Sequence, residues 1–222
     1  MNKSIIFDID GTLLYARGIG RKAFGIAFRT AYGIDYPDVE KLCFVGATDS
    51  GVVRNMADEC GVKNTIAKEE HFFLALTKEI DEELSRKKPL VYEGVPELLE
   101  ELNITGFSLG IITGNIRATA WSKLRHGSID SHFSFGAYGD DHHKREKITE
   151  TAISRAPADS PVSIMIGDTP LDIHAAKTNN LKAIAVATGW VSAKELAEAG
   201  ADLVLNDFSD TQSCINRIME ML

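Results

Sequence analysis

The sequence has few cysteines and no long hydrophobic run, and both shortages narrow the class of protein. Its 222 residues include three cysteines, Cys43, Cys60 and Cys214. Their odd number and wide spacing are not typical of a disulfide framework or of a zinc cluster. No stretch is long and apolar enough to span a bilayer, and the N-terminus enters an apolar run without the pattern of a signal peptide. We therefore expect a cytoplasmic protein that does not bind membranes.

Basic residues are also fewer than acidic residues. Lys and Arg number 24 against 32 Asp and Glu, which gives a net charge of -8. This balance argues against a nucleic-acid surface and is compatible with carboxylates gathered around a cation. The hydrophobic content of 44% is ordinary for a globular protein, and the length suffices for one sizeable core and a smaller module.

An apolar run near the N-terminus ends in two carboxylates on alternate residues. Ser4 to Phe7 is rich in Ile and Phe, which predicts a buried strand, and Asp8, Asp10 and Gly11 follow. On an extended backbone the two aspartates share one face, and Gly11 lets the chain turn away. Carboxylates held so close repel each other, and a divalent cation relieves this repulsion. The alternative is a strand end with solvated aspartates.

Helical periodicity replaces the strand pattern between residues 15 and 90. Apolar residues recur on one helical face in three segments, which end near Gly33, Gly61 and Pro89. Three or four amphipathic helices without strands predict a small helical bundle. Because this bundle directly follows the first strand, we expect it to lie over the C-terminal end of that strand.

From Pro96 onward, helices and strands alternate. Strands are predicted at residues 107–113, 133–137, 162–167, 183–187 and 201–205, and helices at 96–102, 115–125, 147–155, 171–179, after Ser192 and from Ser209. Such alternation predicts an α/β fold, a Rossmann-like doubly wound parallel sheet. We expect residues 1–14 and 91–222 to form this core, with residues 15–90 inserted as an all-helical cap.

The predicted strand exits are rich in carboxylates and hydroxyls. These residues are Asp8, Asp10, Thr113, Gly114, Asn115, Asp168 and Asp172. Ligands of doubly wound sheets bind at the C-terminal ends of the strands, so we expect these side chains to face one crevice. Thr113 and Gly114 precede a helix and could bind an anion, although such a pair also caps helices. Asp172 falls in a first helical turn, where the helix dipole favours a carboxylate in any case.

These motifs, in this order, resemble those of the haloacid dehalogenase superfamily. The resemblance rests on Phe7 to Leu13 (FDIDGTL), Ile111 to Asn115 (IITGN) and Ile166 to Ile173 (IGDTPLDI). It covers nearly the whole chain. The helical segment between the first two motifs is similar to the cap of the phosphoglycolate phosphatase type. The resemblance implies a magnesium-dependent phosphatase that acts on a small phosphorylated metabolite, a phosphoglycolate-like phosphomonoester.

The resemblance also implies catalytic roles, which agree with the chemistry of the residues. Asp8 would attack phosphorus and form an aspartyl phosphate. Asp10 would protonate the leaving alcohol and then deprotonate the water that hydrolyses the intermediate. Thr113, Gly114 and Asn115 would bind the phosphoryl group.

A magnesium site is implied as well. Asp8, the backbone carbonyl of Asp10, and Asp168 would hold Mg²⁺. Asp172 would support the site from farther out or through water.

A phosphoryl group beside several carboxylates also needs a protein cation to balance its charge. Lys144, Arg145 and Lys147 cluster at the start of a predicted helix, and we expect one of them to be this cation and the others to be solvated. The family commonly has a Lys followed by Pro here, and this chain lacks that proline. Similar phosphatases carry an Arg near this place, which favours Arg145 over Lys144 without deciding between them.

Two other functions stay open. A sugar phosphomutase of the same superfamily would keep these residues and exclude bulk water from the intermediate. A non-catalytic phospho-ligand-binding module would keep the fold, but it would not need Asp10. Displacement of halide needs no acid either, so Asp10 favours a phosphatase over a dehalogenase. The expected partner is therefore a small-molecule phosphate ester.

Substrate specificity is expected to come from the cap. The candidates are the loop Val45 to Asp49 and the side chains of Arg17, Arg21 and Arg54. Similar phosphatases often show an Arg where this chain has Ala47. The loss of that cation argues against a strictly phosphoglycolate-like, doubly anionic substrate.

Two further expectations concern the rim of the crevice. We expect the cap to close over the site with hinges near residues 14–18 and 89–94. Trp190 follows a strand on the crevice side. It could contact substrate there, but the size of its side chain favours packing.

Overall fold

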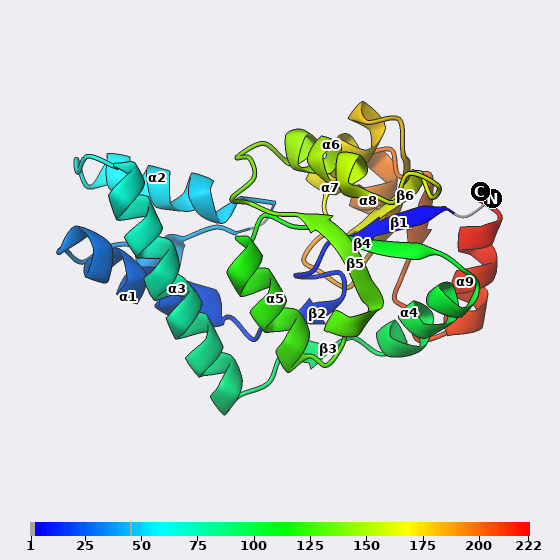
Figure 1. The fold of residues 1–222 in the computed structure, drawn as a ribbon, viewed down its shortest axis with the longest axis horizontal. Coiled ribbons are helices and arrows are strands. Elements are labelled where there is room, and N and C mark those ends of the chain that lie inside the picture. The colour runs from blue at the N-terminus through cyan, green and yellow to red at the C-terminus, as the bar shows by residue number, and fades with distance from the viewer. Residues whose placement is uncertain (1–2, 45) are drawn as a thin grey trace.

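The computed structural model describes residues 3–44 and 46–222, and a parallel sheet lies at its centre (Figure 1). Six strands follow the order β5-β4-β1-β6-β7-β8, with all neighbours parallel. The strands are β1 (Ser4–Phe7), β4 (Ser108–Ile112), β5 (Phe133–Ala137), β6 (Val162–Gly167), β7 (Lys182–Val186) and β8 (Leu203–Leu205). The predicted doubly wound fold is confirmed, and the strand limits agree with the predicted ones within two residues.

Helices cover both faces of the sheet. Side chains alternate along a strand, so Ile5 and Phe7 pack into one helical layer and Ile6 into the other. One layer contains α4 (Val95–Ile104), α5 (Arg117–His126) and α9 (Thr211–Met219), and the other contains α6 (Arg145–Arg155), α7 (Pro170–Thr178) and α8 (Ala193–Glu198). A short 3-10 helix, η2 (Asp130–His132), leads into β5. Burial on both faces fixes the position of β1 and of the residues that leave it.

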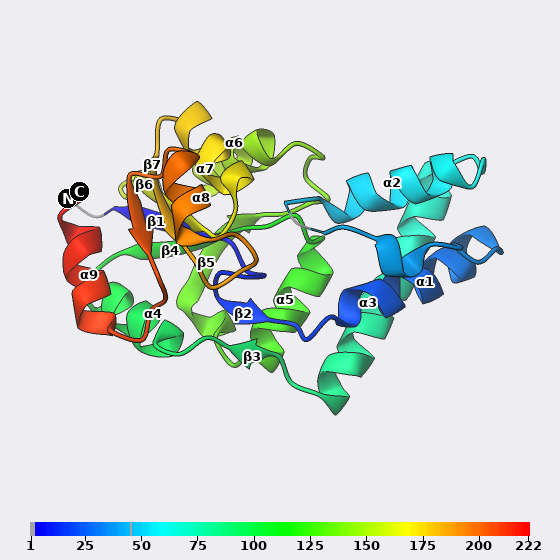
Figure 2. The same ribbon diagram turned by 180° about the vertical axis from the view of Figure 1, so that it is seen from behind.

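The helices between β1 and β4 form a body with its own apolar core. They are α1 (Ile19–Tyr32), η1 (Val39–Lys41), α2 (Asp49–Glu59) and α3 (Ile66–Arg86). Phe24 and Phe28 of α1 pack with Val53 of α2 and Phe72 of α3. Figures 1 and 2 show these helices at one end of the molecule and α9 at the other. α3 lies along α5 of the sheet core, where Ser122 donates a hydrogen bond to Asp81.

A two-stranded ribbon stands where the helical segment joins the core, and no strand was predicted there. β2 (Leu14–Tyr15) pairs antiparallel with β3 (Leu90–Val91). The Tyr92 amide extends the ribbon by donating to the Leu13 carbonyl at 3.1 Å. Strands of two residues are too short to show an alternating pattern, so no sequence signal predicts them. The predicted cap limits, residues 15 and 90, fall inside the ribbon and stay a prediction.

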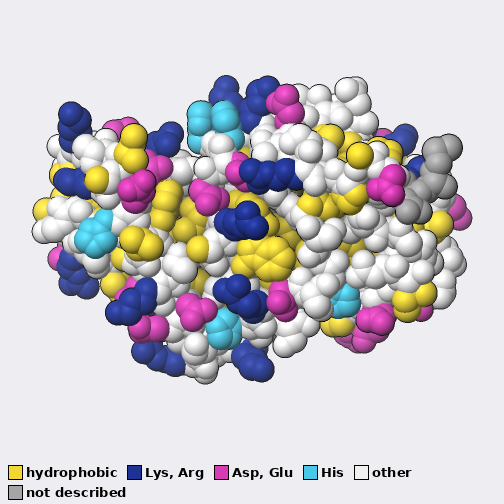
Figure 3. All heavy atoms as spheres, in the orientation of Figure 1, with side chains coloured by type: hydrophobic (Ala, Val, Ile, Leu, Met, Phe, Trp, Pro, Cys, Tyr) yellow, Lys and Arg dark blue, Asp and Glu magenta, His cyan; other side chains and the backbone are white. Residues whose placement is uncertain are grey.

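Charged side chains of both signs are interspersed on the face of the molecule shown in Figure 3. Hydrophobic side chains gather near the middle of this face. Among the described residues, no helix has the length and apolar character needed to cross a membrane.

Candidate active site

The predicted strand-exit residues meet at the C-terminal edge of the sheet. Asp8 follows β1, Thr113 follows β4, and Asp168 follows β6. β1 lies between the other two strands, and the Asp8 amide continues the ladder by donating to the Ile166 carbonyl at 2.9 Å. Residues far apart in the sequence therefore share one crevice, as the topology rule for parallel sheets predicts.

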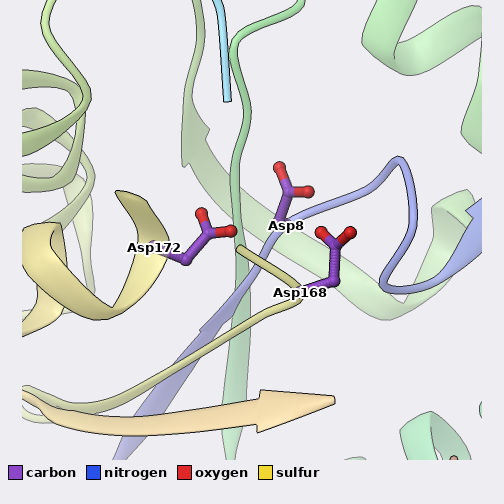
Figure 4. A group of neighbouring side chains, drawn as sticks. All are labelled: Asp8, Asp168 and Asp172. Atoms are coloured by element: carbon purple, nitrogen blue, oxygen red, sulfur yellow. The ribbon is translucent and has the colours of Figure 1, made fainter. Parts of the chain in front are cut away.

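Three buried carboxylates face one another in this crevice (Figure 4). Oxygens of Asp8, Asp168 and Asp172 all lie within 4.8 Å of one another. The Asp10 side chain is not in this group and is 39% exposed. An all-oxygen set of buried carboxylates suits a hard divalent cation such as Mg²⁺, so the donor chemistry fits the ion that the sequence implies.

The electrostatics of the crevice show an excess of negative charge. Burial raises the pKa of Asp8 to about 7, and the carboxylates of Asp172 and Asp10 add to the rise while Arg145 opposes it. Burial likewise raises the pKa of Asp168 to about 8, together with the charges of Asp8 and Asp172. Two carboxylates with raised pKa values mark a place where a further cation would stabilise the ionised forms.

Arg145 is the cation that the structure places against Asp8. Its Nη2 donates to Oδ1 of Asp8 at 2.6 Å, and its Nε donates to Oδ1 of Asp172 at 2.8 Å. Burial alone lowers the pKa of this guanidinium, but the two carboxylates outweigh burial and raise it. Lys144 is an exposed residue that precedes α6, and Lys147 pairs with Glu150 at the surface. Of the three candidate cations, only Arg145 is buried against the carboxylates, and in the described part of the chain no contact supports the inclusion of Lys144 among the site residues.

Asp172 is held more tightly than the other two carboxylates. Its Oδ2 accepts hydrogen bonds from the backbone amide and the hydroxyl of Thr169, and the Asp172 amide donates in return to the Thr169 hydroxyl oxygen, which completes the capping box of α7. Its Oδ1 accepts from Arg145. Both oxygens already have donors, which agrees with a supporting place for Asp172.

Gly11 is required by the close approach of the loop after β1 to Asp168. Its φ is +89°, and a Cβ atom there would lie 2.2 Å from Oδ2 of Asp168. Thr12 donates its hydroxyl to Oδ1 of the same carboxylate at 3.3 Å. The motif residues between Asp10 and Leu13 thus shape the wall next to Asp168.

Thr113, Gly114 and Asn115 border the same cavity. The Thr113 hydroxyl accepts from the side-chain amide of Asn115 at 2.7 Å, and that amide also donates to Oδ2 of Asp10 at 2.7 Å. Asn115 therefore ties the end of β4 to Asp10. The predicted substrate-binding residues are together in the structure.

Lys123 is a site residue that the sequence analysis missed. It is on α5, its side chain is 9% exposed, and its Nζ donates to Oδ2 of Asp10 at 2.6 Å and to Oδ1 of Asn115 at 2.7 Å. Asn115 precedes α5, and Lys123 lies in the second turn of that helix, eight residues farther along the chain. That spacing could have signalled the contact, but many helical lysines share it.

The N-terminus of α2 docks onto the core with a buried aspartate. The Asp49 amide donates to the Gly114 carbonyl at 2.8 Å, and Oδ2 of Asp49 accepts from the Ile116 amide at 2.9 Å. Burial raises the pKa of Asp49 to about 6, although Lys123 opposes the rise. Asp49 therefore has a structural contact that the sequence did not predict.

The other specificity candidates differ in their positions. Arg21 borders the cavity, whereas Arg54 pairs with Glu69 outside it and Arg17 donates to the Lys88 carbonyl. Arg54 and Arg17 are not among the residues that border the cavity, and their part in specificity stays a prediction. Within the loop Val45 to Asp49, Val45 lies outside the described residues.

Trp190 borders the cavity but is not packed into the interior of the protein. Its side chain is 81% exposed, so the packing interpretation from the sequence is wrong. The cavity has a volume of about 800 Å³ and extends from the carboxylates to the apolar side chains of α1 and α3.

Comparison with known proteins gives the family. The haloacid dehalogenase-like hydrolase family matches residues 5–186. Pyrophosphatase PpaX of Anoxybacillus flavithermus is 28% identical over 219 residues, which cover 96% of each protein.

Two solved structures share the fold. CbbY from Rhodobacter sphaeroides in complex with phosphate has a TM-score of 0.73 and 19% identity, over 95% of this chain and 96% of that one. A predicted phosphoglycolate phosphatase from Haemophilus somnus has a TM-score of 0.66 and 19% identity, over 96% and 98% of the two chains. The family match over most of the chain and the named relatives agree with the site: the protein belongs to the haloacid dehalogenase-like hydrolases and is an enzyme of the phosphatase type.

Proposed function

We propose that the protein is a magnesium-dependent phosphatase that hydrolyses a small phosphomonoester through an aspartyl phosphate on Asp8. The observation that carries the proposal is the position of Asp8, which lies at the C-terminal end of the central strand between Arg145 and the carboxylate of Asp168. The resemblance adds the expectation of a phosphoglycolate-like substrate, against whose second anionic group the missing cation at Ala47 argues. The three free cysteines agree with action in the cytoplasm.

In the first step a carboxylate oxygen of Asp8 attacks phosphorus, and the bond from phosphorus to the ester oxygen breaks. Arg145 is already within hydrogen-bond distance of Asp8 and would balance the charge of the phosphoryl oxygens. Thr113 and the Gly114 amide would bind the same oxygens from the end of β4. These groups orient phosphorus for attack along the line of the leaving bond.

Asp10 would move the protons in both steps. It would donate one to the leaving alkoxide and then take one from the water that attacks the aspartyl phosphate. The water oxygen bonds to phosphorus, the bond from phosphorus to Asp8 breaks, and inorganic phosphate leaves. Asn115 and Lys123 hold the Asp10 carboxylate in place for both transfers.

Magnesium would be held by Asp8, the Asp10 backbone carbonyl and Asp168, with Asp172 in support. When bound, it would supply positive charge that screens the attacking carboxylate from the phosphoryl oxygens. The raised pKa values of Asp8 and Asp168 support this assignment, because they reveal negative charge that the protein cations do not fully balance.

Phosphate release tests the proposal. Wild-type protein and Asp8→Asn are assayed with Mg²⁺ or with EDTA on 2-phosphoglycolate, sugar phosphates, phenyl phosphate and pyrophosphate. We expect release that needs Mg²⁺ and falls by at least about a thousandfold in Asp8→Asn, since the nucleophile is lost.

Activity that survives in Asp8→Asn would contradict the assignment of the nucleophile. Transfer of phosphate between sugar hydroxyls without release of phosphate would instead show the phosphomutase. Binding of phosphate esters without either reaction would show the non-catalytic module.

A further inference from the structure

The cavity over the active site is larger than a two-carbon phosphate requires. Its volume of about 800 Å³ lies in the range of pockets that bury ligands of drug size, about 300–1,000 Å³. One end holds Asp8, Asp168 and Arg145, where the phosphoryl group would lie. The rest of the space is therefore available for the organic part of a substrate.

The cap side of this cavity is apolar. Its wall includes Phe24, Leu42, Leu76 and Ile80, which are at most 7% exposed because they also form the core of the helical segment, and the half-buried Phe44. The rings of Phe24 and Phe44 pack edge to face with centroids 4.9 Å apart, so the wall is a fixed aromatic surface. Apolar walls of this kind favour an apolar ligand, because both surfaces leave water on binding.

The described cations that border the cavity already have protein partners, so none is free for a second anionic group of the ligand. The described residues that border it include four Lys or Arg side chains: Arg21, Lys41, Lys123 and Arg145. Lys123 and Arg145 are already bound to site carboxylates. Arg21 donates from Nε to the Leu42 carbonyl at 3.2 Å, and Lys41 pairs with Asp38 at 2.7 Å. Ala47 offers no charge either.

Trp190 provides an aromatic surface at the other side of the cavity. The residue is 81% exposed, which is unusual for one with so large an apolar side chain. It follows Gly189, where a Cβ atom would lie 1.8 Å from Oδ2 of Asp168. Trp190 is thus attached directly to the wall of the phosphoryl site, where a ligand that enters the cavity would cover it.

We propose that the substrate is a phosphomonoester of a ring-bearing apolar alcohol, and that Trp190 selects it by contact with the ring. This inference rests on the proposed function. The phosphoryl group lies against Asp8 and Arg145, and the carbon body lies against Trp190 and the apolar wall of the cap. A small dianionic body such as that of phosphoglycolate leaves Trp190 and Phe44 uncovered and its own second charge unpaired.

Binding to the Asp8→Asn protein tests the inference without a need for turnover. Calorimetry in the presence of Mg²⁺ gives Kd for phenyl phosphate, ethyl phosphate and 2-phosphoglycolate. We expect phenyl phosphate to bind at least about tenfold more tightly than ethyl phosphate, because the ring buries more apolar area. Trp190→Ala should reduce this preference about three- to tenfold, the range typical of an aromatic pair.

Two controls make the result specific. Ile104→Ala removes another exposed apolar side chain, at the end of α4 and outside the cavity, and should keep the preference. In a Trp121→Phe background, Trp190 is the sole tryptophan, so its fluorescence should change with phenyl phosphate.

The inference is overturned if ethyl phosphate or 2-phosphoglycolate binds as tightly as phenyl phosphate. It is equally overturned if Trp190→Ala leaves the preference unchanged. If the wild-type protein hydrolyses no phosphate ester, the proposed function fails, whereas these affinities still decide which class of ester the cavity binds.

Discussion

At the scale of single residues, hydrogen bonds from Lys123 and Asn115 hold the orientation of the Asp10 carboxylate. Lys123 Nζ and the Asn115 side-chain amide both donate to Oδ2 of Asp10, at 2.6 and 2.7 Å. The other oxygen of Asp10 is then the one available for proton transfer. Because Lys123 contacts Asp10 and not the reacting bond, we assign it as a positioning residue. Its removal should cause the same kinetic defect as the removal of Asp10, to a smaller extent.

Lys123→Met should therefore slow the release of poor leaving groups most. Ethyl phosphate needs a proton on its departing oxygen, and a positioned general acid contributes about 10²–10⁴-fold to such steps. We expect kcat/KM for ethyl phosphate to fall at least about tenfold more than kcat/KM for 4-nitrophenyl phosphate, whose leaving group departs without help. This ratio is measured by steady-state kinetics, and kcat/KM is used because it excludes the later hydrolysis of the aspartyl phosphate.

Two further variants calibrate this ratio. Asp10→Asn should show the same dependence on the leaving group in a stronger form, and Lys147→Ala, at the surface, should show none. An equal fall for both esters in Lys123→Met would mean that Lys123 acts on folding or on phosphate binding and not through Asp10.

At the scale of elements, the start of α2 is fitted to the end of β4. Asp49 binds the Gly114 carbonyl and the Ile116 amide, and Ser50 donates its hydroxyl to the Gly139 carbonyl at 2.8 Å. A Cβ atom on Gly114 would lie 2.0 Å from the Ala47 carbonyl oxygen. The helical segment thus approaches the core so closely that glycine alone fits.

Gly114→Ala should push the loop before α2 away from the active site. A methyl group cannot occupy the space of the Ala47 carbonyl, and a displacement of about 1 Å near reacting groups can cost up to about 100-fold in rate. We expect lower kcat and faster hydrogen exchange at the first amides of α2, measured by mass spectrometry. Gly20→Ala on α1 is the matched control, since its nearest neighbour would be 3.9 Å away.

If Gly114→Ala reduces activity but leaves hydrogen exchange in α2 unchanged, the loop is not displaced. The lower activity would then come from the loss of the Gly114 amide as a phosphate-binding group. Faster exchange in Gly20→Ala as well would show that any added methyl group loosens the helices, independently of the contact with Ala47.

The elements also show which features a sequence can predict. The meeting of Asp8, Thr113 and Asp168 was predictable, because parallel strands must bring their exits to one edge. The identity of the cation was not, because it depends on α6 beginning at Arg145, two residues before the predicted start. Helix ends depend on local capping and packing, which apolar periodicity does not record.

Contacts between distant surfaces were equally hidden. The bonds of Asp49 to the core depend on how the helical segment lies over the sheet. That position follows from side chains spread along α3 and α5, and no local motif describes it. Predictions from sequence therefore succeeded for residues fixed by topology and failed for those fixed by the approach of two packed bodies.

At the scale of the whole molecule, the buried carboxylates link stability to pH and to metal. Aspartate in an unfolded chain has a pKa of about 3.9. The folded protein raises the pKa of Asp8 to about 7 and of Asp168 to about 8, mainly through burial. Between about pH 4 and about pH 8, the folded state therefore binds more protons than the unfolded state. The contribution of both groups to the free energy of unfolding is therefore lost as pH rises from about 4 to about 8.

A divalent cation should reverse this loss, because it binds the ionised carboxylates and competes with protons. We expect Mg²⁺ to raise the melting temperature of the metal-free protein more at pH 8 than at pH 5.5, as measured by differential scanning fluorimetry with EDTA as the reference. Asp168→Asn should remove most of this pH-dependent gain, whereas Asp159→Asn, at an exposed position, should retain it. An equal gain at both pH values, or a full gain in Asp168→Asn, would place the magnesium ion elsewhere than among these carboxylates.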